Sequence, residues 1–399
     1  MIRINKLFKP SSKSLVVMGK RRLNATDSLI PLLLELAVKY ELKIIFCVEE
    51  YYVTYRSIRN NAIINDIINN NGTLVLLGGR SKFLIVRYMN WLFHVFFISL
   101  HGLAKGRIFH YGTLNKFPFT LLRMFFSSRI FLIENNTNET DYRTSVLKYK
   151  SSYSDKKITR REGGYLFDKD CKDPRIIYRS STIKNYIPNN DYDFYYYGRS
   201  RSRPLWIDYI SNNADKYFEK YHPTINKSSF IVIVGTIYND TADHLDLRGA
   251  FLKTLDSIQR NYKDQIFLFK PHPLTDIDFV INEFDKRNIR LEITKLHSHI
   301  LATRAIAFVA NGFSNVLTDA HLLGIPTVEF SIYSSKLLKI TNNTSVSENF
   351  VDYFIHNNSD KFIQIMNNLI YNSTPAVVNF QKNKIEVPSA DKVLKDIAY

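Results

Sequence analysis

The chain has 399 residues, more than a single hydrophobic core usually serves, so its length predicts two domains. Hydrophobic residues make up 45% of the sequence and charged residues 23%, a balance that excludes an intrinsically disordered chain. The formal net charge of +17 predicts an anionic partner, with nucleic acid, an anionic membrane surface and an acidic substrate as candidates.

The cysteines and the N-terminal stretch indicate a compartment. Cys47 and Cys171 provide neither a disulfide framework nor a CxxC metal pattern, so a reducing compartment is expected. The stretch MIRINKLFKPSSK is basic but has no apolar run, so it is not expected to be a secretory signal. The sequence therefore predicts a cytoplasmic protein.

The first half alternates short apolar runs with helical segments, which is the pattern of βαβ units around a parallel sheet. A helix is expected over 27–40, with Asp27 or Ser28 as its cap and Pro31 in its first turn. The segment FPFTLLRMFF is expected to be a further helix. The expected strands cover residues 14–19, 43–48, 73–79, 106–112 and 129–135.

The most apolar run, YMNWLFHVFFISLHGL at 88–103, is interrupted by Asn90 and His94. It is short for a membrane-spanning helix, which needs about 20 apolar residues. We therefore expect a core helix first and a membrane-surface helix second.

Residues from about 150 to 225 are rich in Tyr, Ser, Asn, Arg and Asp and are expected to form loops, short helices and the interdomain connection. Apolar runs then return, and two α/β sheets with a cleft between them are expected. The predicted domains are 1–195 with an irregular basic connection to about 225, then 226–375, and a tail at 376–399 that packs back on the first domain. The later expected strands cover 230–236, 266–270, 289–294, 305–312 and 326–330, with helices at 247–262 and 314–324.

The segment IFLFKPHPLTDID places Lys270 and His272, each beside a proline, where an apolar strand ends. Ligands bind at the carboxyl edge of open α/β sheets, so these two side chains are candidates for a ligand site. The alternative is a proline-stiffened turn with two incidental polar residues.

Two more loops are expected at the same edge. In ANGFSNVLTDAHLLGIP, Ser314 stands at a helix start, and free N–H groups at such a start favour phosphate or carboxylate. In VGTIYND, Gly235 permits close backbone approach and Thr236 offers a hydroxyl. The candidate residues of the first loop are Asn311, Gly312, Ser314 and Asn315.

Glu134 ends an apolar strand of the first half and is a candidate general base, with Glu139 and Asp141 as rivals. His297 and His299 are expected on an exposed loop without partners. No Walker A, GxGxxG, H-E-x-x-H or GxSxG pattern occurs, so a P-loop ATPase or an NAD enzyme is not expected. No nucleic-acid-binding module accompanies the positive charge, so nucleic acid is not expected as a partner.

Together these segments resemble bacterial sialyltransferases of the capsule and lipooligosaccharide type, most of all the polysialyltransferase-like group. Lys-Pro-His-Pro at 270–273, including Pro273, is similar to the His-Pro motif of that superfamily. The strand, Ser314 and helix at 311–324 are similar to its serine motif. FLIENNTNETDY at 131–142 stands where the family has an acidic pair followed by glycine, of which only Glu134 is present here.

The resemblance implies a GT-B type fold and an inverting transfer of sialic acid from CMP-sialic acid to a capsule or lipooligosaccharide glycan, without a metal or other cofactor. Glu134 would take the acceptor proton, while His272, Lys270 and the Ser314 helix end would stabilise the departing CMP. Gly235 and Thr236 would contact the nucleotide, and Glu329 the ribose hydroxyls. CMP-Kdo or CDP-glycerol is the alternative donor, and a basic protein without catalysis is the second alternative.

The basic surplus then predicts an anionic glycan acceptor and association with the inner face of the cytoplasmic membrane. Basic residues cluster at 20–22, 156–161 and 199–203, and the expected contact is the arginine-rich middle segment.

Overall fold

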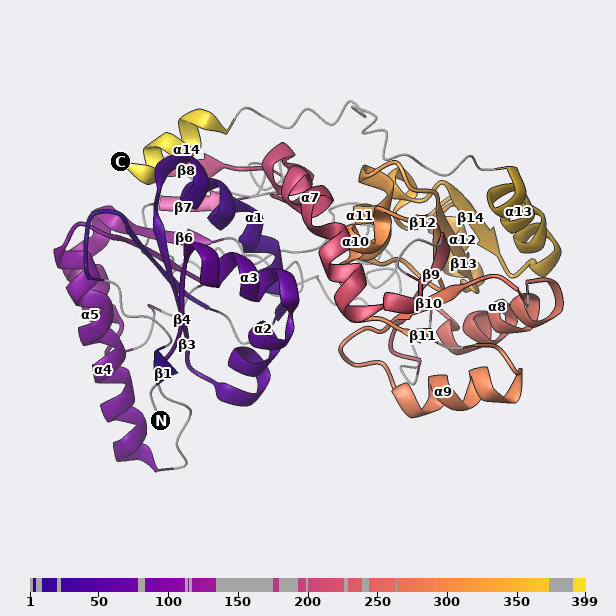
Figure 1. Ribbon diagram of the computed structural model, residues 1–399, viewed down its shortest axis with the longest axis horizontal. Helices are drawn as coiled ribbons and strands as arrows, with labels where there is room; N and C mark the ends of the chain where they lie inside the picture. Colours follow the sequence, from indigo (N-terminus) through magenta and orange to yellow (C-terminus); the bar gives the residue numbers. More distant parts are fainter. Residues whose placement is uncertain are drawn as a thin grey trace. The chain divides into compact units, whose positions relative to one another are not determined.

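The computed structural model describes residues 3–4, 9–19, 23–77, 83–111, 114, 117–133, 175–178, 193–198, 200–225, 229–238, 244–262, 264–290, 292–372 and 390–399. These residues form two α/β units, each with its own sheet (Figure 1). Unit 1 holds the described residues up to Ile207 together with 390–399, and unit 2 holds those from Asp208 to 372. The division falls inside the helix α7 (Pro204–Tyr221), whereas the sequence placed it near residue 225.

Unit 1 is built on an eight-stranded sheet in the order β1-β4-β3-β2-β5-β6-β7-β8. Every strand pair in it is parallel except β1 with β4. The central strands are runs of Val, Ile, Leu and Phe because helices cover both faces of such a sheet. The strands are β1 (Arg3–Ile4), β2 (Ser14–Met18), β3 (Lys43–Val48), β4 (Gly72–Leu76), β5 (Arg107–His110), β6 (Ile130–Ile133), β7 (Arg175–Tyr178) and β8 (Asp193–Tyr196).

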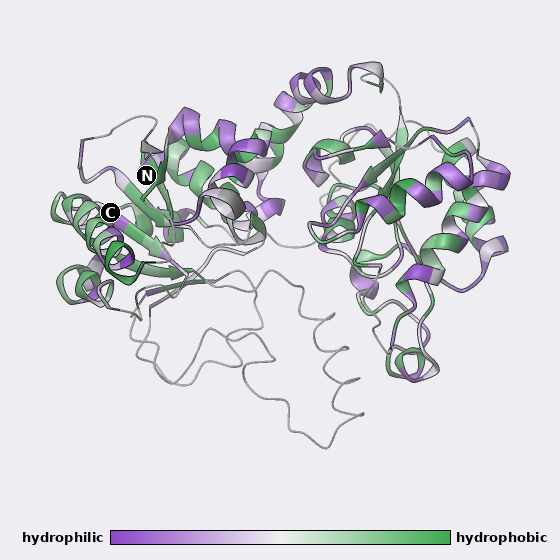
Figure 2. Ribbon diagram, turned by 90° about the horizontal axis from the view of Figure 1, so that it is seen from below, coloured by the Kyte–Doolittle hydropathy of each residue, from purple (hydrophilic) through white to green (hydrophobic). Residues whose placement is uncertain are grey.

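The helices of unit 1 bury their apolar residues against this sheet. Figure 2 shows hydrophobic residues running through the strands, while many helices are hydrophobic on one side and hydrophilic on the other. The helices are α1 (Leu23–Tyr40), α2 (Arg56–Asn60), α3 (Ala62–Asn71), α4 (Leu84–Leu103), α5 (Thr120–Phe126) and α14 (Asp391–Ala398), with a π-helical turn at Tyr51–Tyr55.

Helix α1 begins earlier than the sequence predicted. It starts at Leu23, so Asp27 is not its cap and Pro31 lies inside it. Asp27 instead forms an ion pair with Arg201. Tertiary pairing has therefore replaced the local capping role that the sequence pattern favoured.

The basic segment 199–203 was expected to face a partner, but its described arginines are engaged within unit 1. Arg203 is buried, donates to the Glu35 carboxylate at 2.6 Å and stacks on the ring of Tyr197. Arg201 is paired as described above. The clusters at 20–22 and 156–161 lie outside the described residues, as does Arg199.

The region expected to be loops and short helices contains regular elements. Strands β7 and β8 extend the sheet by parallel pairing, and α7 is an 18-residue helix. Each of these strands is only four residues long and has polar neighbours, so its apolar signal is weak in sequence. Pairing with β6 supplies the stability that the local pattern does not reveal.

The C-terminal helix α14 packs within unit 1. Lys39 on α1 lies 3.0 Å from the carboxylate of Asp391, and the rings of Tyr40 and Tyr399 meet edge to face. Arg107 donates to the carbonyl of Ile397 at 3.1 Å. These contacts join the end of the chain to elements that are nearly 300 residues or more away in sequence.

Unit 2 is built on a six-stranded parallel sheet in the order β11-β10-β9-β12-β13-β14. Its core lies between the buried strands and the helices α8, α9 and α13. The strands are β9 (Phe230–Val234), β10 (Phe267–Lys270), β11 (Glu292–Ile293), β12 (Ala305–Ala310), β13 (Thr327–Ser331) and β14 (Tyr353–His356).

Side-chain caps fix where several helices of unit 2 begin. Asp246, Asp276 and Ser334 each accept a backbone N–H from the first turn of the helix that follows. These caps orient α8, α9 and α12, and so fix the loops that precede them. The helices are α8 (Leu247–Asn261), α9 (Ile277–Lys286), α10 (Ser298–Ala302), α11 (Asn315–Leu322), α12 (Ser335–Ile340) and α13 (Ser359–Asn372).

Candidate active site

The candidate site lies at the carboxyl edge of the unit 2 sheet, where strands β9 and β12 are neighbours. The chain leaves β9 toward β10 on one side and leaves β12 toward β13 on the other, which makes this pair the topological switch point of the sheet. Val234 pairs with Ala310, so Gly235 and Asn311 follow from adjacent strand ends. Ligands of open α/β sheets bind in the crevice at such a point.

Strand β10 brings the Lys-Pro-His-Pro segment to the same edge. Its last residue, Lys270, pairs with Val234, and its ammonium group donates to the carbonyl of Leu296 at 2.6 Å. This bond orients the Lys270 ammonium group at the end of the strand. Pro271 and His272 are half-buried, and Pro273 is exposed.

His272 is held in one tautomer by its own loop. The backbone N–H of Leu274 donates to Nδ1 of the imidazole at 3.2 Å, so in the neutral ring the proton resides on Nε2. Burial lowers the pKa of His272 below its ordinary value, which keeps the ring neutral at pH 7. His272 therefore offers Nε2–H as a hydrogen-bond donor.

Thr275 joins the two loops, and the sequence analysis did not single it out. Its hydroxyl donates to the carbonyl of Thr236 and accepts the backbone N–H of His272, both at 2.9 Å. The signal was available, because a threonine three residues after a loop residue commonly bonds its backbone. Thr275 is a positioning residue for both Thr236 and His272.

Gly235 allows the loops after β9 and β10 to approach closely. Its N–H donates to the carbonyl of Lys270 at 2.8 Å. A Cβ at this position would lie 2.7 Å from the ring of Phe269 and 3.0 Å from the backbone of Pro271. Any larger residue would therefore displace the segment that carries His272.

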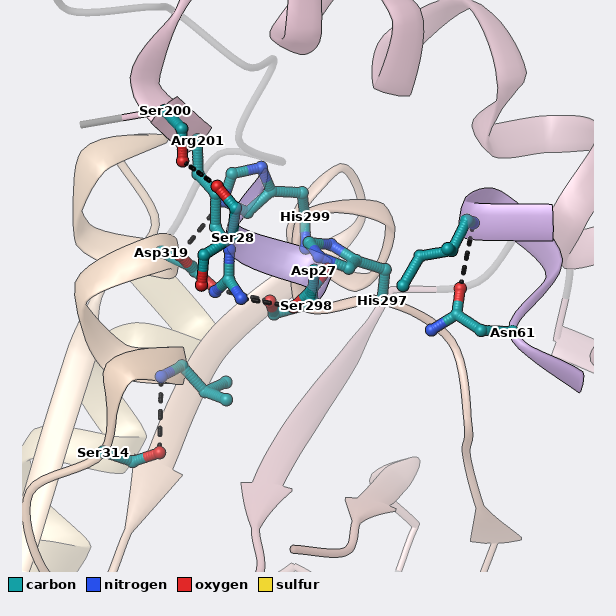
Figure 3. A network of polar contacts seen from close by, with 12 residues as sticks. Asp27, Ser28, Asn61, Ser200, Arg201, His297, Ser298, His299, Ser314 and Asp319 are labelled. Atoms are coloured by element: carbon teal, nitrogen blue, oxygen red, sulfur yellow. Dashed lines mark hydrogen bonds and ion pairs between the residues drawn. The ribbon is translucent and has the colours of Figure 1, made fainter. Parts of the chain in front are cut away.

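Helix α11 presents its N-terminus at this edge. Ser314 is its cap and accepts the N–H of Val316 at 3.3 Å (Figure 3), as the sequence predicted. Gly324 follows the helix with a positive φ of 75°, the expected C-terminal signal. Ser314 and Asn315 are both partly exposed at the start of the helix.

A buried polar cluster fixes α11, and here the sequence analysis was wrong. His297 and His299 are not on an exposed loop but are buried at the start of α10. The hydroxyl of Ser298 donates to Asp319 at 2.6 Å, and Nε2 of His299 lies 3.3 Å from the same carboxylate (Figure 3). Asp319 is on α11, so this cluster connects α10 to the helix that begins at Ser314.

Asn311 and Gly312 lie inside the unit. The Asn311 amide donates to the hydroxyl of Thr254 at 2.8 Å and to the carbonyl of Phe330 at 3.2 Å. A Cβ on Gly312 would lie 2.8 Å from the side chain of Leu247. In this structure both residues shape the loop after β12 from within, and their roles toward a donor stay predictions.

Glu329 is fully buried rather than exposed at a strand end. Its carboxylate accepts the hydroxyls of Ser331, Tyr333 and Ser345 at 2.6–2.7 Å. Burial raises its pKa, and the three hydroxyl groups oppose that rise. Its described contacts connect β13 to the segment around Ser345, while contact with a ribose stays a prediction.

Glu134 lies outside the described residues, as do Glu139 and Asp141. Within the described parts of the chain, no group of three or more His, Cys, Asp and Glu residues is placed to hold a metal ion. The edge of unit 2 thus combines donors of three kinds. They are the Lys270 ammonium, the His272 Nε2–H and the backbone N–H groups of α11, a set that suits a phosphate.

No protein-family model matches the sequence, and no curated protein does. Solved structures do resemble it. UDP-GlcNAc 2-epimerase from Neisseria meningitidis, bound to UDP-GlcNAc, aligns with a TM-score of 0.55 at 13% identity over 96% of this chain and 98% of that chain. UGT89C1 from Arabidopsis thaliana, complexed with UDP, aligns at 0.53 with 12% identity, over 96% and 98%. UDP-GlcNAc 2-epimerase from Methanocaldococcus jannaschii aligns at 0.50 with 13% identity, over 88% and 91%.

Likenesses at this level of identity show the fold. The chain has two parallel-sheet α/β units of the GT-B type, as the sequence predicted.

Proposed function

We propose that the chain is a glycosyltransferase that binds a nucleotide-activated sugar at the carboxyl edge of unit 2. The observation that carries this proposal is that three loops leave the adjacent strands β10, β9 and β12 at the same edge of the sheet. Gly235 and Thr236 follow β9, Lys270 and His272 follow β10, and Ser314 begins the helix after β12. The UDP and UDP-GlcNAc in the complexes of the structural neighbours support a nucleotide-sugar ligand for this fold.

The donor that we place first is CMP-sialic acid, because the His-Pro and serine motifs resemble those of bacterial capsule and lipooligosaccharide sialyltransferases. The acceptor would be an anionic surface glycan. CMP-Kdo and CDP-glycerol are alternative donors of the same superfamily. Glu329 and Asn311 enter this proposal as supports of the donor loops.

The proposed reaction is an inverting displacement. The acceptor hydroxyl oxygen forms a bond to the anomeric carbon, the bond from that carbon to the phosphate oxygen breaks, and the acceptor proton passes to Glu134. Negative charge grows on the departing nucleotide phosphate. His272 Nε2–H, the Lys270 ammonium and the α11 N-terminus would stabilise that charge, and removing one such donor typically costs about 10²–10³ in kcat.

A nucleotide panel tests the proposal by thermal shift. CMP-sialic acid, CMP-Kdo, CDP-glycerol and UDP-GlcNAc are each added to the protein, with CMP and UDP alone. A ligand that binds only the native state stabilises it by about 2.7 kcal/mol when its concentration is one hundred times Kd. We expect the cytidine nucleotides to raise the melting temperature more than UDP and UDP-GlcNAc do, because the proposed donor is a cytidine nucleotide. Release of CMP from the stabilising donor is then measured with a sialylated or galactosylated acceptor, with and without EDTA, and EDTA is expected to have no effect.

A UDP-sugar epimerase is the second candidate, because two of the structural neighbours are UDP-GlcNAc 2-epimerases. It predicts stabilisation by UDP, not CMP, and conversion of UDP-GlcNAc without any acceptor. A basic binding protein without catalysis predicts neither nucleotide shift nor turnover. Either result would overturn the transferase proposal.

A further inference from the structure

Helices α4 and α5 are neighbours in unit 1 (Figure 1). Large apolar side chains lie exposed on both of them. We define the α4–α5 face as the apolar residues within 83–103 and 117–125 that are more than a third exposed. Six of the most exposed are Ile85 (78%), Phe83 (75%), Met124 (74%), Phe125 (73%), Leu103 (72%) and Met89 (62%). Contiguous apolar patches on a protein surface mark interaction sites.

The two helices form one continuous surface because they pack against each other. The ring of Trp91 on α4 lies 6.3 Å from that of Phe119, at the start of α5. Gly102 allows the closest approach, since a Cβ there would lie 3.0 Å from the ring of Phe126. Exposed residues of both helices are therefore parts of the same face.

The second half of α4 is anchored in unit 1. His94 bonds the carbonyl of Leu77, and Nδ1 of His101 lies 3.0 Å from the hydroxyl of Ser14. Burial lowers the pKa of both histidines to about 4, so these bonds hold neutral rings at pH 7. Val95 and Ile98 are buried in the same core.

This anchoring determines whether α4 can span a membrane or only lie at its surface. By length and composition, its 20 residues are enough to span a bilayer, unlike the shorter run expected from sequence. No residue from Leu84 to Phe93 is buried, however, whereas the second half of the helix is held inside unit 1 by His94, Val95, Ile98 and His101. With its second half fixed in the core of a folded unit, α4 can meet a membrane at the interface but cannot span it. The core-helix expectation thus describes only the second half.

The positive charge around the α4–α5 face indicates what binds to it. Residues 67–133 contain no Asp or Glu and have eight Lys and Arg residues, Arg87, Lys105 and Arg123 among them. Arg87 and Arg123 are on α4 and α5, and Lys105 is exposed just after α4. Two copies of the face would bring like charges together, whereas anionic phospholipids attract them.

We propose that the α4–α5 face docks on the surface of an anionic phospholipid bilayer, with its apolar side chains at the acyl boundary and its basic residues on the headgroup phosphates. This surface belongs to unit 1 and does not depend on the proposed reaction in unit 2. It gives the expected location on the inner face of the cytoplasmic membrane a specific structural basis.

Co-sedimentation of the full chain with vesicles tests the proposal. Vesicles of phosphatidylcholine alone are compared with vesicles that contain 30% phosphatidylglycerol, at 50 and 300 mM NaCl. We expect binding to the anionic vesicles only, weakened about tenfold or more at the higher salt. Brominated acyl chains should quench the fluorescence of Trp91, which borders the face.

Matched variants separate the apolar contribution from charge. Met124→Ser with Phe125→Ser should lower vesicle affinity by about tenfold or more. Arg123→Glu should weaken binding and flatten its salt dependence. Tyr371→Ser, which removes an exposed ring (72%) from α13 in unit 2, should change nothing.

Three results would overturn the proposal. They are no binding to the anionic vesicles at 50 mM NaCl, equal binding by the double serine variant, and a dimer that the double serine variant dissociates without any vesicle binding. The last would make the face an interface between two copies. Unchanged melting temperatures of the variants show that their effects are not due to unfolding.

Discussion

The imidazole of His272 contacts its own loop through Nδ1, while Nε2 is the nitrogen proposed to contact the nucleotide. Nδ1 accepts the N–H of Leu274, and burial lowers the pKa, so both observations favour the neutral ring. An unfolded chain would bind more protons at this residue just below its ordinary pKa of about 6.5. The stabilisation from His272 is therefore present above that pH and is lost as the pH falls through the lowered value.

Two substitutions separate the functions of the two nitrogens. His272→Asn keeps an acceptor for the N–H two residues on but has no group at the Nε2 position. His272→Gln keeps a donor near that position but loses the loop acceptor. We expect the His272→Asn variant to keep the melting temperature of the wild type and to lose about 10²–10³ in kcat. The His272→Gln variant should lose less activity than His272→Asn but should melt at a lower temperature. Turnover and thermal unfolding of both variants measure this split.

Wild type and His272→Asn should be about equally stable at pH 7. As the pH falls from 7 to 5, the wild type should become the less stable of the two, because only His272 takes up a proton on unfolding. If Asn retained full turnover, the Nε2–H would have no part in the reaction. If the stability difference were independent of pH, the lowered pKa would be excluded.

At the scale of elements, loops of unit 2 fix one another. Thr275 bridges the loops after β9 and β10, and the close approach at Gly235 brings them together. On the other side of the switch point, the buried contacts of Asp319 connect α11 to α10. The site is thus built from side-chain contacts between loops that are distant in sequence.

Thr275→Val tests the bridge, because valine has a similar shape and no hydroxyl. It leaves the N–H of His272 and the carbonyl of Thr236 without this partner, which typically costs about 1–3 kcal/mol. We expect kcat/KM to fall about tenfold. Thr275→Ser, which retains the hydroxyl, should remain near the wild type, and equal kinetics of the two variants would remove Thr275 as a positioning residue.

At the scale of the whole molecule, the chain returns to its first unit after completing its second. Leu394 and Ile397 of α14 are buried there, although they follow the last helix of unit 2 by some twenty residues in sequence. Such a crossing means that the end of the chain stabilises unit 1, while nucleotide binding is proposed for unit 2.

Leu394→Ala should therefore destabilise unit 1 without weakening nucleotide binding. Large-to-small changes in a core cost about 2–5 kcal/mol, which corresponds to a fall in melting temperature of about 5–15 °C for a unit of this size. Lys392→Ala on the exposed side of the same helix is the control and should change little. Calorimetry measures the melting temperature and titration measures the affinity for the nucleotide. If Leu394→Ala weakened nucleotide binding as well as unit 1, the prediction that the two effects are separate would be wrong.

The sequence by itself determined the alternation of strands and helices, the existence of two units, and the placement of Gly235, Lys270, His272 and Ser314 at strand ends. These features follow from local patterns, because apolar runs of strand length, prolines and helix caps act on nearest neighbours. The strands β7 and β8, at 175–178 and 193–196, were not predicted, because pairing with neighbouring strands rather than local composition makes them strands.

Only the tertiary structure decided which polar side chains face inward and which apolar ones face outward. Glu329 and Arg203 are buried because partners distant in sequence form hydrogen bonds with them, and His299 is buried beside the Asp319 carboxylate. Phe125 and its neighbours are exposed because only a few residues of α4 and α5 pack into the core. Burial depends on contacts between segments far apart in the chain, so no local pattern could fix it.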